Sequence, residues 1–302
     1  MVALKTATTA GKPITSTALK KMKAAETSQG DDRYIVPALR RGLAILRLFT
    51  AERRVITLPE IVRELGISRA TAFRLAYTLE ADGLMQRAPH SNAFQLGLRV
   101  LSLGFEYLAS LDLLHIARPV LEELRDSTDA SVHMGIRDGA EIVYVLSAPS
   151  QHRLRSNITV GSRMPAYATS IGHAVLFDAS LEELRKLNRG VKMKRFSEQT
   201  PSNVDEVYAK LEEERRKGYV SYRSAYAPGI ASVAAPVRDQ SGAIVAGINV
   251  SDYESLPAMQ DLDGALRDKV LRAAMAISRD LGFRPAGANG RLHRTETGAA
   301  AG

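Results

Sequence analysis

Two arginines stand five residues apart in the stretch ISRATAFRLAYTLEADG, residues 67–83, and their side chains suit the recognition of anions. A guanidinium group donates paired hydrogen bonds to phosphate oxygens or to the edge of a guanine base. The first acidic residue in this stretch is Glu80, after both Arg69 and Arg74. A solvated helix surface would carry mixed charge, so the pattern favours a polyanionic partner for these two side chains.

The apolar spacing of this stretch predicts a helix that directs both arginines away from the protein core. Its core stripe follows the i, i+3, i+4, i+7 rule at Ala72, Leu75, Ala76 and Leu79. The hydroxyl of Ser68 is well placed to cap its start. The opposite face carries Ala70, Phe73, Arg74 and Tyr77, flanked by Arg69 and Thr71. This is the layout of a recognition helix, whose N-terminal residues meet base edges.

A shorter helix precedes this one in the stretch TLPEIVRELG, residues 57–66. Thr57 and Glu60 have the spacing of a capping box, and Gly66 ends the helix. Two short helices joined by about three residues form a helix-turn-helix. After Gly83, the stretch LMQRAPHSNAFQL predicts two short strands around a turn, which is a wing with Arg87 near its tip.

A further helix is expected upstream, beginning at about Pro37. Its apolar face consists of Leu39, Leu43, Ile45, Leu46 and Phe49.

Most of the excess positive charge lies in the first third of the chain. The net charge is +8, and residues 34–96 carry nine arginines against five acidic residues, whereas residues 97–302 are nearly neutral. A basic segment beside a neutral one indicates a polyanion partner, although a solvated basic surface is the alternative. We expect double-stranded DNA to contact Arg40, Arg41, Ser68, Arg69, Thr71, Arg74 and Arg87.

The chain divides into an N-terminal DNA-binding part and a larger C-terminal part. We predict a disordered basic tail (1–33), a winged helix-turn-helix domain (34–97), a linker helix (98–114), an effector-binding domain (115–285) and a second disordered tail (286–302). The linker helix is rich in apolar residues and would be exposed on a lone domain, so we expect it to pack against a partner chain.

Strand and helix patterns alternate in the C-terminal part. Hairpins are expected over 131–148 and 232–252, and a further strand over 153–160. Helices are expected at about 170–188, 203–217 and 261–281. Antiparallel hairpins with helices grouped around them make an α+β domain.

The sequence offers little for an enzyme, a metal or a cofactor. It has no cysteine, and it contains neither a G-x-S-x-G elbow nor a nucleotide-binding G-x-x-x-x-G-K-[ST] loop. The histidines at 115, 133, 152 and 173 lack the spacing of a metal motif. We therefore expect no cofactor and no catalysis. The rival classes are a hydrolase or other enzyme with His173 as its general base, and an architectural DNA-binding protein without a ligand.

The chain has no run of 18 apolar residues and no apolar secretory leader, so we expect no membrane partner and a cytoplasmic location. The composition of residues 1–30 also resembles a transit peptide, which is the alternative.

Residues 34–283 resemble the IclR family of bacterial transcription regulators. The anchors are ALRRGLAILRLF, SRATAFRLAYTL, VGSRMPAYATSIGHAVL and KGYVSYRSAYAPGIASVAAPVRDQSGAIVAGINVSD, in that order. The resemblance implies a winged helix-turn-helix followed by an effector domain related to GAF and profilin-like folds. It also implies homodimers, often paired into tetramers. GSRMPAYATS looks most like the branch that controls aromatic-acid catabolism, and RNA polymerase stays open as a further partner.

The stretch PAYATSIGHAVL, residues 165–176, suits a carboxylate. Thr169 and Ser170 precede a helix-like run, and the free N–H groups of a helix start attract anions. The alternative is that Ser170 only caps the helix. Asn249 and Ser251 alternate with apolar neighbours, so they share one strand face, on which polar groups need a reason.

The resemblance carries the family's pocket onto this sequence residue by residue. It implies backbone amides at Ser170 and Ile171, an apolar wall at Met164, a facing strand at Ser156, and polar groups at Tyr222, Ser232, Asn249 and Ser251. One departure is that no acidic residue stands between Tyr222 and Gly229, where the family commonly has one. Arg153, Arg155 and Arg163 are nearby cations, each expected at the surface rather than on the ligand. The predicted ligand is a small aromatic or dicarboxylic acid that controls a catabolic operon.

Overall fold

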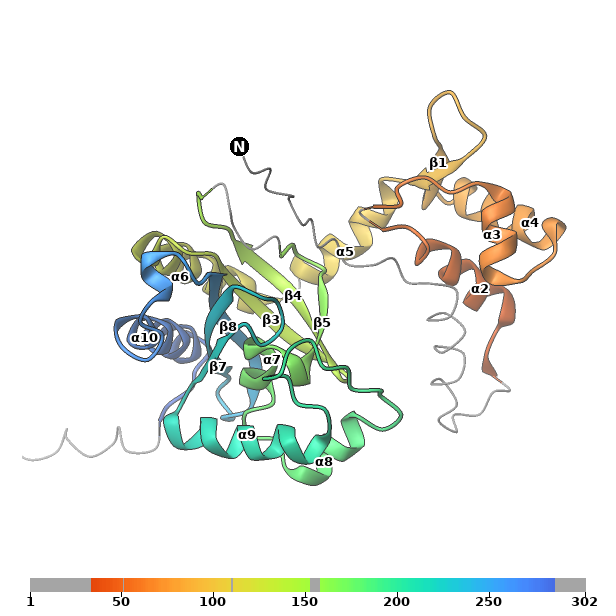
Figure 1. Cartoon of the computed structure of the whole chain (residues 1–302). Helices are drawn as coiled ribbons and strands as arrows, with labels where there is room; N and C mark the ends of the chain where they lie inside the picture. The colour runs from red at the N-terminus through yellow and green to blue at the C-terminus, as the bar shows by residue number, and fades with distance from the viewer. Residues whose placement is uncertain (1–33, 51, 110, 153–157, 286–302) are drawn as a thin grey trace, which may run out of the picture. The chain divides into compact units, whose positions relative to one another are not determined.

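A computed structural model describes residues 34–50, 52–109, 111–152 and 158–285. The chain forms two compact units, residues 1–110 and 111–302 (Figure 1). The expected tails, as well as Ser156, Arg153 and Arg155, lie outside the described residues.

The N-terminal unit is a helix-turn-helix with a wing. It contains α2 (Pro37–Leu46), α3 (Leu58–Leu65), α4 (Arg69–Ala81), β1 (Met85–Arg87), β2 (Phe94–Leu96) and α5 (Arg99–Ala109). Ile45, Ile56, Ile61 and Phe94 are fully or almost fully buried and form the centre of its core. The strands β1 and β2 pair antiparallel, which confirms the predicted wing.

Local signals fix the ends of α3 and α4 as the sequence predicts. The Thr57 hydroxyl accepts a hydrogen bond from the Glu60 amide, and Glu60 accepts one from the Thr57 amide at 2.8 Å. Gly66 adopts a left-handed conformation with φ of 62° at the end of α3. The Ser68 hydroxyl accepts from the Thr71 amide at 3.2 Å and caps α4. The capping box and the α4 cap are therefore confirmed.

Two expectations for this part of the chain are wrong. Leu39 and Leu43 do not face the core, because they are 62% and 45% exposed, and in α2 Ile45 is fully buried instead. The helix expected over 98–114 is divided, since α5 ends at Ala109 and a new helix begins at Asp112. An acidic residue in the first turn favours a helix start there, because it complements the positive end of the helix dipole.

The C-terminal unit is built on a six-stranded antiparallel sheet. Its elements are α6 (Asp112–Thr128), β3 (Val132–Asp138), β4 (Glu141–Ala148), β5 (Arg163–Pro165), η2 (Ala166–Ala168), α7 (Ser170–Val175), α8 (Leu181–Leu187), α9 (Val204–Lys217), β6 (Val220–Arg223), β7 (Ile230–Arg238), β8 (Ile244–Tyr253), η3 (Pro257–Met259) and α10 (Ala265–Asp280). The strand order is β5-β4-β3-β8-β7-β6. The helices α6 and α10 lie on one side of the sheet, and α7 to α9 on the other (Figure 1). The α+β fold class is thus confirmed.

The two predicted hairpins are confirmed as β3–β4 and β7–β8. The helix expected over 170–188 is wrong in extent, because α7 ends at Val175 and Ser180 starts α8 with its own capping box. The third strand expected over 153–160 falls largely outside the described residues, and β5 begins at Arg163.

No single helix in the described ranges is long and apolar enough to cross a membrane; α5 and α6 meet that criterion only as a broken pair.

Candidate functional site

The outward face of α4 combines arginines with exposed aromatic rings. Ala72, Ala76 and Leu79 are buried, whereas Arg69 and Arg74 are exposed. Phe73 is 49% and Tyr77 62% exposed, and their rings stack with centroids 6.3 Å apart. The helix therefore presents cations and flat apolar groups side by side, which suits the edges and methyl groups of bases in a major groove.

A groove runs along this face toward the wing, all within the N-terminal unit. It encloses about 880 Å³ and is lined by the start of α3, by α4 and by the wing. Its lining residues include Thr57, Pro59, Arg69, Ala70, Phe73, Arg87 and Asn92. Arg69 and the wing residues thus border one concave surface, which we name the α4–wing groove.

Arg87 has less freedom than its predicted place near the wing tip suggests. Its Nε donates to Glu80 Oε1 at 3.1 Å, and its Nη1 donates to the Asn92 carbonyl at 3.2 Å. The guanidinium also lies 4.1 Å from the centre of the Phe94 ring. Arg87 therefore braces the wing against α4, and Glu80 offsets its charge. Arg40 and Arg41 are exposed near the start of α2.

In the C-terminal unit, polar side chains line the sheet face that packs against α7. A Cβ added at Gly247 would lie 3.0 Å from the Ile171 carbonyl oxygen, so this position of β8 faces α7. Asn249 and Ser251 follow at alternate positions and are 3% and 4% exposed. The prediction that they share one strand face is confirmed, and that face is buried under the helix.

The start of α7 is capped by Thr169 and not by Ser170. The Thr169 hydroxyl accepts from the Gly172 amide at 3.1 Å, and Ser170 is the first residue of the helix. The Ser170 hydroxyl lies 3.5 Å from Asn249 Nδ2. Capping therefore does not explain Ser170, which together with Ile171 brings the start of α7 against β8.

Two more polar residues, Ser232 on β7 and Tyr222 on β6, follow Ser251 across the sheet. In the sheet, Ser232 pairs with both Ser251 and Tyr222. The Tyr222 hydroxyl donates to Glu214 Oε1 at 2.8 Å and lies 2.8 Å from His173 Nδ1. Burial, reinforced by the Glu214 charge, raises the pKa of Tyr222 well above its usual value. Its phenol is thus a neutral donor held inside the protein.

His173 and Glu214 complete this buried cluster. His173 Nε2 donates to the Tyr167 carbonyl at 3.0 Å, while Nδ1 lies 2.8 Å from Glu214 Oε2. Both ring nitrogens are engaged and the side chain is fully buried, so His173 has no open path to a substrate as a general base. Glu214 brings a buried carboxylate to Tyr222 and His173 from α9. Its i+7 spacing from Val207 on α9 is a signal that could have identified it as a core-facing residue.

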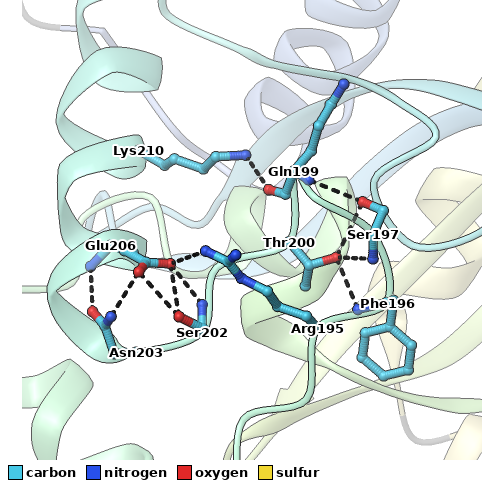
Figure 2. A network of polar contacts seen from close by, with 9 residues as sticks. All are labelled: Arg195, Phe196, Ser197, Gln199, Thr200, Ser202, Asn203, Glu206 and Lys210. Atoms are coloured by element: carbon cyan, nitrogen blue, oxygen red, sulfur yellow. Dashed lines mark hydrogen bonds and ion pairs between the residues drawn. The ribbon is translucent and has the colours of Figure 1, made fainter.

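The loop before α9 is held by the network in Figure 2. Asn203 caps α9, and Glu206 accepts from the Ser202 amide at 2.8 Å. Lys210 donates to the Gln199 carbonyl at 2.6 Å. The ammonium group of Lys210 also lies 4.8 Å from the centre of the Tyr222 ring, and burial lowers its pKa. The loop and α9 are therefore fixed together over the Tyr222 cluster.

The remaining predicted residues lie at the edge of the site. Met164 on β5 is half-buried, and its sulfur accepts from the Tyr144 hydroxyl at 3.7 Å. Arg163 is a surface arginine as predicted, because it pairs with Asp138 at 2.5 Å and with Glu141 at 2.9 Å. The described residues contain no group of three metal-ligating side chains.

Comparison with known proteins matches both units. The model of the IclR helix-turn-helix domain matches residues 38–89, and that of the bacterial transcriptional regulator IclR C-terminal domain matches residues 105–279. The Pca regulon regulatory protein of Pseudomonas putida is 28% identical over 270 residues, which is 89% of each chain.

Two solved structures share the fold. A transcriptional regulator of Rhodococcus sp. RHA1 is 35% identical with a TM-score of 0.72, covering 82% of this chain and 98% of that one. An IclR homologue of Microbacterium hydrocarbonoxydans, solved in complex with 4-hydroxybenzoate, is 21% identical with a TM-score of 0.70, covering 81% and 98%. The second supports the fold alone.

Proposed function

Because the chain belongs to the IclR family of bacterial transcriptional regulators, we propose that it senses a small organic acid and thereby controls a catabolic operon. It is a DNA-binding transcriptional regulator with a ligand-binding C-terminal domain. The effector shifts an equilibrium between a state that binds DNA and one that does not. The size of this shift is set by the difference in its affinity for the two states.

The observation that carries this proposal is the buried polar row between α7 and the sheet. Ser170, Asn249 and Ser251 are buried, and Asn249 meets Ser170 at the first turn of α7. Small-molecule sites are mostly apolar with a few placed polar groups. Met164 and Ile171 would form an apolar wall, which favours an aromatic acid as the effector. The first compound to test is 4-hydroxybenzoate, the ligand in the Microbacterium structure.

We infer that the effector carboxylate is seated at the Ser170 and Ile171 amides. Replacing Ser170 by proline removes one amide donor with little strain, because proline suits the first position of a helix. The preceding Thr169 is already extended (φ −120°, ψ 149°), as a residue before proline must be. Losing a charge-assisted hydrogen bond of about 1.5–3 kcal/mol should weaken binding of the acid roughly 10- to 150-fold, and binding of its primary amide less.

The experiment is calorimetry with the acid that stabilises the protein most in a thermal-shift screen, paired with its amide. Ser170→Ala is the matched control, because it removes the hydroxyl but keeps the amide donor. Equal discrimination between acid and amide in wild type and Ser170→Pro would place the carboxylate elsewhere. Recovery of chemically altered ligand would favour the enzyme class, and the absence of any ligand response would favour an architectural protein.

We also propose that the protein acts as a homodimer or a dimer of dimers in the cytoplasm. Leu98, Leu101, Leu103 and Tyr107, in and just before α5, are between 52% and 82% exposed within this chain. Exposed apolar side chains in such number are typical of a surface that a partner covers. Analytical ultracentrifugation at micromolar concentration should therefore detect dimers or tetramers. Footprinting should detect two DNA half-sites whose centres are separated by about one helical turn or a multiple of it. A purely monomeric protein on a single half-site would refute this.

A further inference from the structure

Three polar side chains lie in one row across neighbouring strands of the C-terminal sheet. His133 on β3 pairs with Ser147 on β4 and with Asn249 on β8. Gly135 and Gly247 stand two residues along the same strands, and a Cβ at either would meet Ile171 of α7. The row therefore faces α7. His133 is fully buried and Asn249 is 3% exposed.

The hydrogen bonds of Ser147 fix where the proton of His133 lies. The Ser147 hydroxyl donates its one proton to the Ile158 carbonyl at 3.1 Å, because a carbonyl can only accept. The same oxygen lies 3.1 Å from His133 Nδ1 and must accept there. His133 is therefore protonated at Nδ1, and its Nε2 carries a lone pair.

Burial keeps the ring in this neutral form at physiological pH. It lowers the pKa of His133 to about 4, and the opposing effect of the Asp252 charge is smaller. Asp252 itself accepts from the hydroxyls of Ser131 and Ser150 at 2.9 and 3.0 Å, so its carboxylate is already engaged. His133 Nε2 is consequently an acceptor and not a donor.

Within the described ranges, neither His133 Nε2 nor Asn249 Oδ1 has a hydrogen-bond partner. Asn249 uses its Nδ2 toward the Ser170 hydroxyl at 3.5 Å. Two buried acceptors thus stand on paired residues of neighbouring strands, on the sheet face that packs against α7. Unsatisfied buried polar groups are rare in native proteins and indicate a missing partner.

We propose that the effector presents an O–H or N–H donor to His133 Nε2 and Asn249 Oδ1. This inference rests on the proposed function and narrows the ligand class to hydroxy- or amino-substituted organic acids. An ionised carboxylate has only acceptor atoms, so it is repelled by both groups and belongs at the α7 amides instead. A plain dicarboxylate is accordingly a poor ligand, because its second carboxylate would face two lone pairs.

Nitrogen NMR of the full-length protein with labelled histidine tests the acceptor directly, without any ligand. We expect one ring with a protonated Nδ1 and an unprotonated Nε2 near neutral pH, whose signals disappear in His133→Phe. In Ser147→Ala the acceptor for Nδ1–H is lost, so the other tautomer should become populated. Protonation of His133 at Nε2 in the wild-type protein would overturn the proposal.

Calorimetry with matched compounds tests the donor requirement. The probes are 4-hydroxybenzoate, 4-aminobenzoate and 4-methoxybenzoate, together with lactate and 2-methoxypropionate as an aliphatic pair. In each series we expect the donor-bearing acid to bind at least about tenfold more tightly than its methyl ether. Comparing 4-hydroxybenzoate with 4-aminobenzoate shows whether the site prefers an O–H or an N–H donor. In His133→Phe, and less completely in Ser147→Ala, the ratio should fall toward one.

Equal affinity of hydroxy and methoxy acids for the wild-type protein would contradict the donor requirement. The partner of His133 would then be an ordered water and not the effector. The same conclusion follows if the tenfold preference survives in His133→Phe. If no organic acid binds at all, the proposed effector class fails, and the tautomer measurement still decides whether His133 offers an acceptor.

Discussion

Replacing Arg74 by alanine is expected to weaken binding to the operator by about 1–3 kcal/mol, or roughly 5- to 150-fold in Kd. This is the usual contribution of one bidentate contact between an arginine and a base. Arg74 lies on the exposed face of α4 with Phe73 and Tyr77, opposite the buried Ala72 and Ala76. Arg69 borders the α4–wing groove. We propose that it contacts a base or a phosphate next to the base that Arg74 contacts.

Gel-shift titrations on an operator located by footprinting and on random-sequence DNA measure this effect. Arg185→Ala is the charge control, because it removes the same charge from an exposed side chain on α8 of the other unit. A loss confined to the operator means a base contact, and an equal loss on both DNAs means a phosphate contact. Unchanged binding to both would rule out α4 as the recognition helix.

The second large effect is expected in the C-terminal unit, where Gly172→Ala should destabilise the fold by about 3 kcal/mol, the upper end for an overpacked core. A Cβ at this position would lie 2.1 Å from the Ala166 carbonyl oxygen and 2.6 Å from two further backbone atoms of Ala166. Backbone atoms cannot turn aside as a side chain can, so α7 must move away from η2. The polar row against β8 would move with it.

Urea unfolding followed by circular dichroism, together with effector calorimetry, measures both consequences. Gly42→Ala is the matched control, because no heavy atom lies within 4 Å of the added Cβ and the residue is inside α2. Alanine is favoured over glycine there by about 1 kcal/mol, so this variant should be stabilised. An unfolding midpoint of Gly172→Ala equal to that of the wild type would mean that α7 tolerates the displacement.

The recognition helix could be predicted from sequence because its determinants lie within one or two helical turns of each other. The cap at Ser68, the stripe at Ala72, Ala76 and Leu79, and the turn at Gly66 act over a few residues. Local spacing also produced a wrong prediction in α2. The period-3.6 spacing of Leu39 and Leu43 is that of a core face, yet the core of the N-terminal unit does not extend to them.

The ligand site depended on contacts between distant segments. Asn249 could be assigned to a polar strand face from alternation alone, and Ser170 to a helix start from its neighbours. That the two meet follows from the packing of α7 on β8, 79 residues apart in sequence. The acceptor on His133 follows from three neighbouring strands and a loop residue, which no spacing rule connects.

The sequence by itself therefore determined the helix-turn-helix, its outward arginines, the two hairpins and the polar face of β8, because short-range periodicity, caps and turns encode them. Only the tertiary structure decided that Thr169 caps α7, that Glu214 and His173 enclose the Tyr222 hydroxyl, and that His133 presents a lone pair beside Asn249. These features depend on which strands become neighbours and on which of the described polar atoms are buried without a protein hydrogen-bond partner. Both are set by the packing of the whole unit.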